Sequence, residues 1–372
     1  MIVMDLKLDN IYSFNDFHLN MSYPKKIVNS NIEDEFLSDR PNFRYKKVNI
    51  LMGSNATGKT TIGKALMAIF NFITKKNPVP LVDCISDKSK KASFSIDFVT
   101  NKMKLCQVKA IISPAESEIY KEENINLTVK SVAINKADSY EICVKKLDEL
   151  KSQNVSYIEA LNEIENFGWF FSYPIPESNI KTVKDLDKEA FRNILEIVLS
   201  TLDPSVQSVR EGTDIEDTYI IKLNDHDLII QDGKVLNDEM LSSGTKSGVD
   251  IAIMLTSILT KLHGFYYCDE KFSYIHSDLE VAILSVMINN LGKNEQLFFT
   301  THNANILDMM LPKHSFVFLK KEQIDDESRI RCIYADDYLK RNTDSLRKAV
   351  ENDLFSTAPN LSFLDRLNGI KN

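Results

Sequence analysis

The feature that most constrains the fold of this chain is a glycine-rich segment that begins at Gly53. It reads GSNATGKT and fits the pattern G-x-x-x-x-G-K-[ST], in which a tight loop turns several backbone N–H groups toward one phosphate. The apolar run at 46–52 predicts a buried strand before the loop, and the pattern from Lys59 onward predicts a helix after it. This order predicts a nucleotide site, although a glycine-rich turn before a helix is the plainer alternative.

Two residues of the loop carry its expected chemistry. Lys59 would set a positive charge against the β- and γ-phosphates, and Thr60 would offer its hydroxyl to Mg²⁺. The helix that begins near Lys59 would direct the positive end of its dipole at the same phosphates.

Three later segments add candidate residues. In 241–250 (LSSGTKSGVD), small and hydroxyl residues precede a helical pattern, which predicts either an anion site or an ordinary helix cap. An apolar strand then ends at Asp269 and Glu270, acids suited to holding Mg²⁺ and activating water, or else simply solvated. A second apolar strand ends at His302, which would either donate to the γ-phosphate or be an ordinary histidine at a strand end.

Other stretches predict the surrounding structure. Residues 4–24 alternate polar and apolar side chains and predict two strands with a turn near 13–16. β-Branched and aromatic content predicts antiparallel strands at 92–99, 104–112, 126–134 and 139–144. A helical pattern runs from 145 to 202, and 217–236 predicts two strands joined by a turn.

In their order along the chain, the four site segments resemble the ABC-type ATPase head of the SMC/RecF/OLD-like branch, also described as AAA-family ATPases with an ABC-like head. The resemblance covers residues 1 to about 319. DEKFSYIHSDLE (269–280) is similar to that branch's Asp-Glu followed by Ser-x-x-His, and FFTTHN (298–303) to its switch-histidine strand. It implies an α/β P-loop NTPase of ABC-ATPase type, with a mixed central sheet, an antiparallel β lobe and a helical insertion.

The resemblance also implies ATP and Mg²⁺ as cofactors and a role for each site residue. The triphosphate would be held by Gly53, Ser54, Asn55, Ala56, Thr57, Gly58, Lys59, Thr60 and Thr61. Thr60 and Asp269 would hold Mg²⁺, and Glu270 would be the catalytic base, acting with Lys59 and the switch residue His302. The γ-phosphate of a second protomer would meet Ser242, Ser243 and Gly244, with 273–277 at the interface. Two ATP molecules would then be sandwiched in a homodimer, which higher oligomers could extend.

The sequence departs from the family pattern in several places. The expected glutamine of the Q-loop is not evident; Gln107 and Gln153 are candidates, and each is more simply an ordinary strand or surface residue. The helical region 145–202 lacks the sustained heptads of a long coiled coil. The paired acids Asp336 and Asp337 are interpreted as a solvated strand end and not as part of a nuclease domain.

Charge and cysteine usage bear on partners and compartment. The net charge is −8, yet residues 1–113 hold 17 basic and 10 acidic residues, against 28 and 43 in the remainder. The surplus includes the lysine pairs at 25–26, 46–47 and 75–76 and the run 88–91; it indicates either a footprint for nucleic acid or ordinary solvated charge. Five cysteines without a C-x-x-C pair, and no apolar run of membrane-spanning length, predict a cytoplasmic protein with no membrane segment.

Four ranges are expected: an ATP-binding lobe at 1–113, a β/helical insertion at 114–202, a lobe with the remaining site segments at 203–320, and an extension at 321–372. The resemblance favours an ATP-driven dimeric switch that controls a separate effector in anti-phage defence. The alternative is a RecF/SMC-like ATPase that binds DNA in repair or maintenance. A transporter subunit and a head that binds ATP without turnover are the remaining hypotheses.

Overall fold

The computed structural model describes residues 1–28, 30–115, 120–151, 156–173, 184–212, 215–224, 226–236, 242–324, 327–341 and 343–357. The candidate residues Gln153 and Leu241 lie outside these ranges. Within them, no helix combines the length and the apolar character that crossing a bilayer would require.

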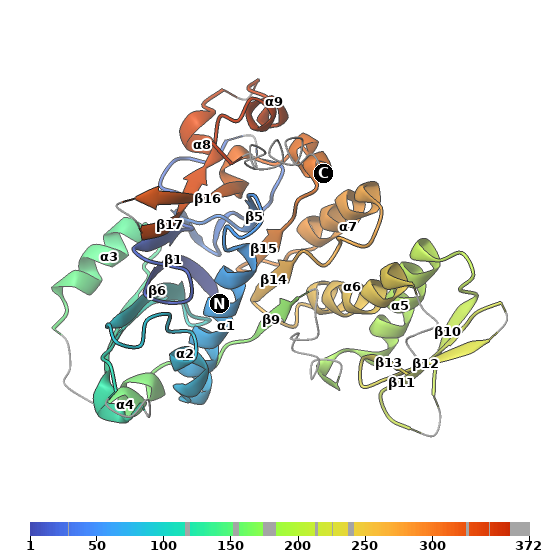
Figure 1. Cartoon of the computed structure of the whole chain (residues 1–372), viewed down its shortest axis with the longest axis horizontal. Coiled ribbons are helices and arrows are strands. Elements are labelled where there is room, and N and C mark those ends of the chain that lie inside the picture. Colours follow the sequence, from blue (N-terminus) through green and yellow to red (C-terminus); the bar gives the residue numbers. More distant parts are fainter. Residues whose placement is uncertain are drawn as a thin grey trace, which may run out of the picture.

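A six-stranded sheet forms the centre of the fold, in the order β17-β16-β5-β15-β14-β9 (Figure 1). Its strands are β5 (Val48–Met52), β9 (Trp169–Ser172), β14 (Phe265–Asp269), β15 (Gln296–Thr300), β16 (Phe316–Ile324) and β17 (Glu327–Tyr334). Neighbouring strands are parallel except for the pair β16–β17. This confirms the expected mixed central sheet. Strands β5, β15 and β14 are parallel neighbours, so their carboxyl ends meet at one edge.

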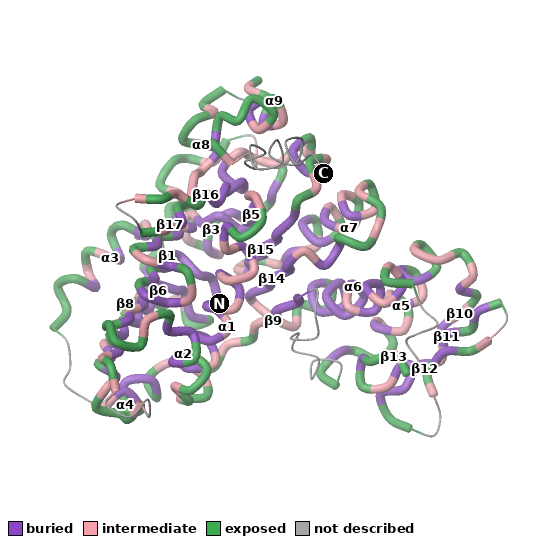
Figure 2. The backbone as a smooth tube through the Cα atoms, in the orientation of Figure 1, coloured by how far each residue is buried: buried purple, intermediate pink, exposed green. Residues whose placement is uncertain are grey.

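Alternate residues of the central strands face two different cores. On one face, Tyr267 and Phe298 pack with α1 (Lys59–Lys75) and with a second sheet. On the other face, Tyr266 and Phe299 pack with α6 (Ser243–Leu259) and α7 (Ser277–Asn289). Because both faces are covered, β5, β14 and β15 are buried along their whole length (Figure 2).

Helix α1 lies unusually close to β14. A Cβ added to Gly63 of this helix would sit 2.6 Å from a ring carbon of Tyr267, closer than any real contact. The Tyr267 hydroxyl donates to the carbonyl of Lys59 at 2.6 Å, so the same ring also holds the first turn of the helix. The position therefore requires glycine.

The second sheet is fully antiparallel, in the order β2-β1-β6-β7-β8. Its strands are β1 (Ile2–Asp9), β2 (Phe17–Asn20), β6 (Ala92–Val99), β7 (Lys104–Ile112) and β8 (Ile125–Ala133). The expected antiparallel lobe is confirmed. The strand predicted at 139–144 is wrong, because this segment begins α3 (Tyr140–Glu149), which Ser139 caps. Its aromatic and apolar residues recur at helical spacing, with Tyr140, Cys143 and Leu147 buried.

A third group of elements stands apart on the far side of β14 from α1 (Figure 1). We call it the α5–α6 unit: α5 (Lys188–Leu202), α6 and a four-stranded antiparallel sheet of β10 (Ser208–Glu211), β11 (Thr218–Lys222), β12 (Asp227–Gln231) and β13 (Lys234–Leu236). The strand pair predicted at 217–236 corresponds to β11 and β12, extended by β13. Strand β9, in the range 114–202, pairs with β14 at the edge of the central sheet.

The remaining elements are short. Among the described residues they include β3 (Phe36–Leu37), β4 (Arg40–Arg44), α2 (Val79–Val82), α4 (Tyr157–Asn162), α8 (Ala335–Tyr338), α9 (Leu346–Glu351) and 3₁₀ turns at 122–124, 304–308 and 313–315. Asp336 and Asp337, expected at a solvated strand end, lie instead in α8 directly after β17. Asp336 is not simply solvated, because it pairs with Lys25 at 3.3 Å.

Candidate nucleotide-binding site

The glycine-rich loop connects β5 to α1 at the carboxyl edge of the central sheet. Gly53 has φ +152° and Gly58 has φ +96°, values that side-chain-bearing residues rarely adopt. A Cβ on Gly53 would also lie 2.6 Å from the carbonyl oxygen of Leu319 in β16. The hydroxyl of Thr57 donates to the carbonyl of Ser54 at 2.8 Å and closes the loop on itself. These constraints give the curled backbone that a phosphate cradle needs.

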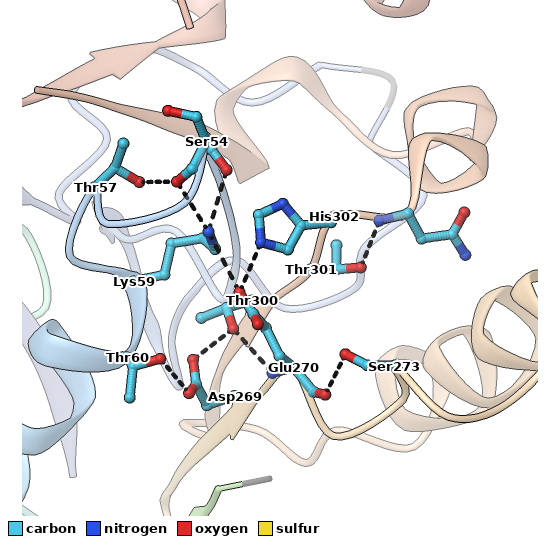
Figure 3. Close-up of polar contacts among 12 residues, drawn as sticks. Ser54, Thr57, Lys59, Thr60, Asp269, Glu270, Ser273, Thr300, Thr301 and His302 are labelled. Carbon is cyan, nitrogen blue, oxygen red and sulfur yellow. Dashed lines mark hydrogen bonds and ion pairs between the residues drawn. The ribbon is translucent and has the colours of Figure 1, made fainter. Parts of the chain in front are cut away.

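Lys59 lies folded over this loop and is 5% exposed. Its Nζ donates to the carbonyl oxygens of Gly53 at 3.1 Å and Ser54 at 3.4 Å, and lies 3.3 Å from Oε1 of Glu270 (Figure 3). The ammonium group is thus held at the mouth of the loop by weak, exchangeable contacts, where a phosphate would replace them.

Asp269, the last residue of β14, is fully buried between two threonine hydroxyls. Thr60 donates to its Oδ2 and Thr300 to its Oδ1, each at 2.6 Å. Burial raises the pKa of this carboxyl above its usual value, against the effect of the two hydrogen bonds. The hydroxyl of Thr60 and the Oδ2 of Asp269 are hard oxygen donors that already point at one another, which fits the expected Mg²⁺ pair.

Glu270 is held next to the loop in a defined orientation. Nε2 of His302 lies 2.9 Å from its Oε1. This contact, ahead of the charge of Lys59, lowers the pKa of Glu270. The residue has φ +43°, a costly conformation for a non-glycine residue. Its N–H donates to the Oγ1 of Thr300 at 3.0 Å, which stabilises this backbone turn.

Thr300 is a site residue that the sequence reasoning missed. It ends β15 and pairs in register with Asp269 on β14, so its hydroxyl reaches both the aspartate and the N–H of Glu270. The signal for it was its place two residues before His302, at the end of a strand expected beside the Asp-Glu strand.

Glu280 and its partners were missed as well. Oε1 of this buried acid accepts from the hydroxyl of Thr301 at 2.6 Å, and Oε2 from the amide of Asn303 at 2.8 Å. The same amide donates to the carbonyl of Ser277 at 2.9 Å. The two residues that flank His302 are therefore tied to the first turn of α7.

The structure brings together most of the expected site but leaves one group elsewhere. The loop 53–61, Asp269, Glu270 and His302 meet at one edge of the central sheet (Figure 3). Ser242 instead caps α6, accepting from the N–H of Thr245 at 3.1 Å. A Cβ on Gly244 would lie 3.2 Å from the carbonyl oxygen of Tyr274, within the expected interface segment.

Gln107 is an ordinary strand residue, as its simpler interpretation expected, and part of the basic surplus is not on the surface. Gln107, a candidate for the Q-loop, lies in β7 of the antiparallel sheet, where its amide donates to Asp97 at 2.9 Å in the core. Part of the basic surplus is internal. Lys46 lies 3.7 Å above the ring of Tyr334, with a pKa lowered by burial to about 8. Lys47, 2% exposed, donates to a backbone carbonyl. Neither lysine can contribute to a surface footprint.

Comparison with solved structures identifies the fold. An SMC head bound to the C-winged helix domain of ScpA matches at TM-score 0.51 and 14% identity, over 91% of this chain and 100% of that chain. An SMC head with an extended coiled coil from Pyrococcus furiosus, bound to the C-terminal domain of ScpA, matches at TM-score 0.51 and 14% identity, over 91% and 98%. The recombination mediator protein RecF matches at TM-score 0.42 and 10% identity, over 89% and 98%.

Searches against protein-family models and against curated proteins gave no match. The structural likeness is therefore a statement about fold: the chain has the fold of an ABC-type ATPase head, as in SMC proteins.

Proposed function

We propose that this chain hydrolyses ATP with Mg²⁺, using Glu270 as the catalytic base. The observation that carries the proposal is the meeting of Lys59, Glu270 and His302 beside the buried Thr60–Asp269 pair. These groups lie at the carboxyl edge of a sheet with the ABC-type ATPase fold, where a phosphoryl-transfer site needs a cation, a metal-binding pair and a base.

The polar contacts suggest how the residues would act. Mg²⁺, held by Thr60 and Asp269, would supply charge neutralisation on the phosphates. Lys59 would exchange its contacts with the loop carbonyls and Glu270 for the γ-phosphate. Glu270 is ionised at neutral pH, since its contact with His302 lowers the pKa of an already acidic group, and His302 would orient it to accept a proton from the attacking water.

In the proposed active form, two copies of the chain bind two ATP molecules between them. The N-terminus of α6, with Ser242, Ser243 and Gly244, would serve the nucleotide of the second copy, as helix N-termini do for anions. The interface would include 273–277, where Tyr274 and His276 are exposed. A ligand that bridges two copies stabilises their association, and hydrolysis removes that stabilisation.

We further propose that this cycle controls a separate effector protein, as in anti-phage defence. The defence setting depends on the sequence resemblance alone, and the cytoplasmic location stays a prediction. The support for a switch is that residues next to the catalytic groups contact these helices: Lys271, after Glu270, pairs with Asp250 of α6, and Asn303, after His302, donates to Ser277 of α7.

The test is Glu270→Gln, with Lys222→Met, an exposed lysine of β11, as control. We expect hydrolysis to fall about 10²–10⁴-fold with ATP binding retained, the effect of losing a general base. We also expect ATP to double the solution mass of the variant. Undiminished hydrolysis would refute the role of Glu270, and an unchanged mass with bound ATP would refute the sandwich. Failure to capture any host protein in ATP would count against an effector.

A DNA-binding ATPase is the second candidate, because Lys88, Lys90 and Lys91 are exposed in the loop before β6. This proposal predicts ATP-dependent binding to DNA that weakens steeply as salt rises, and weakens further when the three lysines are replaced by alanine. Absence of binding at low salt would exclude it.

A further inference from the structure

Lys271, the residue after Glu270, is a buried lysine that the reaction described so far does not use. It is 6% exposed. Its Nζ forms an ion pair with Asp250 of α6 and donates to the carbonyl oxygen of Tyr173, directly after β9, at 2.7 Å. One ammonium group therefore joins the end of β14 to α6 and to the edge strand β9.

A buried lysine at this position is unfavourable for the stability of the fold. Removing an ammonium from water costs several kcal/mol unless a carboxylate and further acceptors replace its hydration. An apolar side chain would fill the same space without that cost. What the charge adds is specificity, because only one placement of α6 puts Asp250 within reach of Lys271.

Glu270 is fixed on its other sides by hydrogen bonds. Its N–H is bound to Thr300 of β15, and its carbonyl accepts from the hydroxyl of Ser273 at 2.7 Å. Its φ of +43° leaves the backbone in a conformation that persists only under such restraint. Lys271 is the restraint on the remaining side, so a shift of α6 acts on the adjacent peptide of Glu270.

Helix α6 is attached to β14 and the segment after it at three levels. Near its C-terminus, the Tyr266 hydroxyl donates to the carbonyl of Ser257 at 2.9 Å. At its N-terminus, Gly244 lies against the backbone of Tyr274. The ion pair with Asp250 lies between these two levels, two turns from the residues proposed to meet the second nucleotide.

We propose that Lys271 is a positioning residue that couples the placement of α6 to the orientation of Glu270. The inference rests on the proposed ATPase function and deepens it. Contact of Ser242, Ser243 and Gly244 with the nucleotide of the second copy fixes α6; through Asp250 and Lys271, α6 then fixes Glu270. A chain thereby hydrolyses its own ATP only when its α6 also contacts the nucleotide of the second copy.

The test compares Lys271→Met, Asp250→Asn and the double variant with the wild type. We expect each single variant to lower kcat about tenfold or more, since small misplacements of a catalytic group have effects of that order. KM and the affinity for a non-hydrolysable ATP analogue should stay within about threefold. The double variant should be no slower than either single variant, because the two side chains act as one unit.

Thermal unfolding separates positioning from simple stability. Asp250→Asn leaves the buried ammonium of Lys271 without its carboxylate and should lower Tm, whereas Lys271→Met leaves only the partly exposed Asp250 unpaired and should lower Tm less. The double variant should recover most of the loss seen in Asp250→Asn. The proposal requires that kcat stay low in the double variant while Tm recovers, and that Lys222→Met change neither. Recovery of kcat together with Tm, or wild-type kcat in Lys271→Met, would overturn it. Absence of Glu270-dependent hydrolysis in the wild type would instead refute the proposed function.

Discussion

The carboxyl edge of the central sheet and the α5–α6 unit use polar residues in opposite ways. At the edge, side chains from different elements and loops bond to one another: Thr60 and Thr300 to Asp269, and His302 to Glu270. In the α5–α6 unit, several polar side chains instead bond to the backbone of their own helix, as the caps Asp187 and Ser242 do. The difference supports the proposal that the chemistry takes place at the edge and that the unit acts through its placement.

Asp269→Asn should give the largest effect and sharpen this comparison. Burial raises the pKa of Asp269, so the native state holds its proton more tightly than the unfolded chain, whose pKa is near 3.8. Stability of the wild type therefore falls as pH rises above 3.8, and the full penalty is present above the raised pKa. At pH 7 without nucleotide the variant should have the higher Tm.

Although Asp269→Asn should raise stability in the absence of ligand, it should lower the rate of hydrolysis. With Mg²⁺ and ATP, only the wild type gains stability by binding, and hydrolysis by the variant should fall by about 10² or more. Measuring Tm with and without Mg²⁺–ATP tests both parts. A lower Tm in the absence of ligand would show that the buried carboxylate stabilises the fold, contrary to this reading.

A matched pair of glycine substitutions tests the packing of the two regions. Gly63→Ala in α1 places a methyl group 2.6 Å from the buried ring of Tyr267, which also holds the carbonyl of Lys59. Gly248→Ala in α6 meets the terminal methyl groups of Leu202 and Leu199, at 2.7 and 2.9 Å, which can turn aside more easily. We expect Gly63→Ala to cost about 1–3 kcal/mol by denaturant unfolding, and Gly248→Ala less. Equal costs would show that the two regions are packed alike.

The smallest effect is expected from the two helix caps. Ser242→Ala and Asp187→Ala each remove a side chain that accepts from a backbone N–H, and each should cost about 1 kcal/mol of stability. Only Ser242→Ala should also lower hydrolysis, because Ser242 is proposed to meet the nucleotide of the second copy. Equal hydrolysis in both variants would reduce Ser242 to an ordinary cap.

Much of the edge could be predicted from the sequence because its residues lie in contiguous motifs. The glycines of the loop adopt backbone conformations that other residues rarely adopt, and the apolar runs before Asp269 and His302 indicated β14 and β15, although β15 ends at Thr300. β-Branched and aromatic content indicated the antiparallel strands, and the mixed central sheet was implied by the family resemblance.

What the sequence reasoning missed includes one local pattern that was misinterpreted and several contacts that are long-range. The segment 139–144 has the composition of a strand, yet Ser139 caps a helix and the apolar spacing fits one face of it. Charge counting placed Lys46 and Lys47 on the surface, although tertiary packing buries both. The partners of Lys271, Asp250 and Tyr173, lie 21 and 98 positions away in the sequence, so no local pattern predicts them.

The close approach of Gly63 to Tyr267 has a mechanical consequence. There is no room for even a methyl group between α1 and β14, so the two elements cannot slide past each other. They form one rigid pair that keeps the glycine-rich loop and Asp269 in a fixed relative position. Any conformational change in the molecule must then occur at contacts other than the one between α1 and β14.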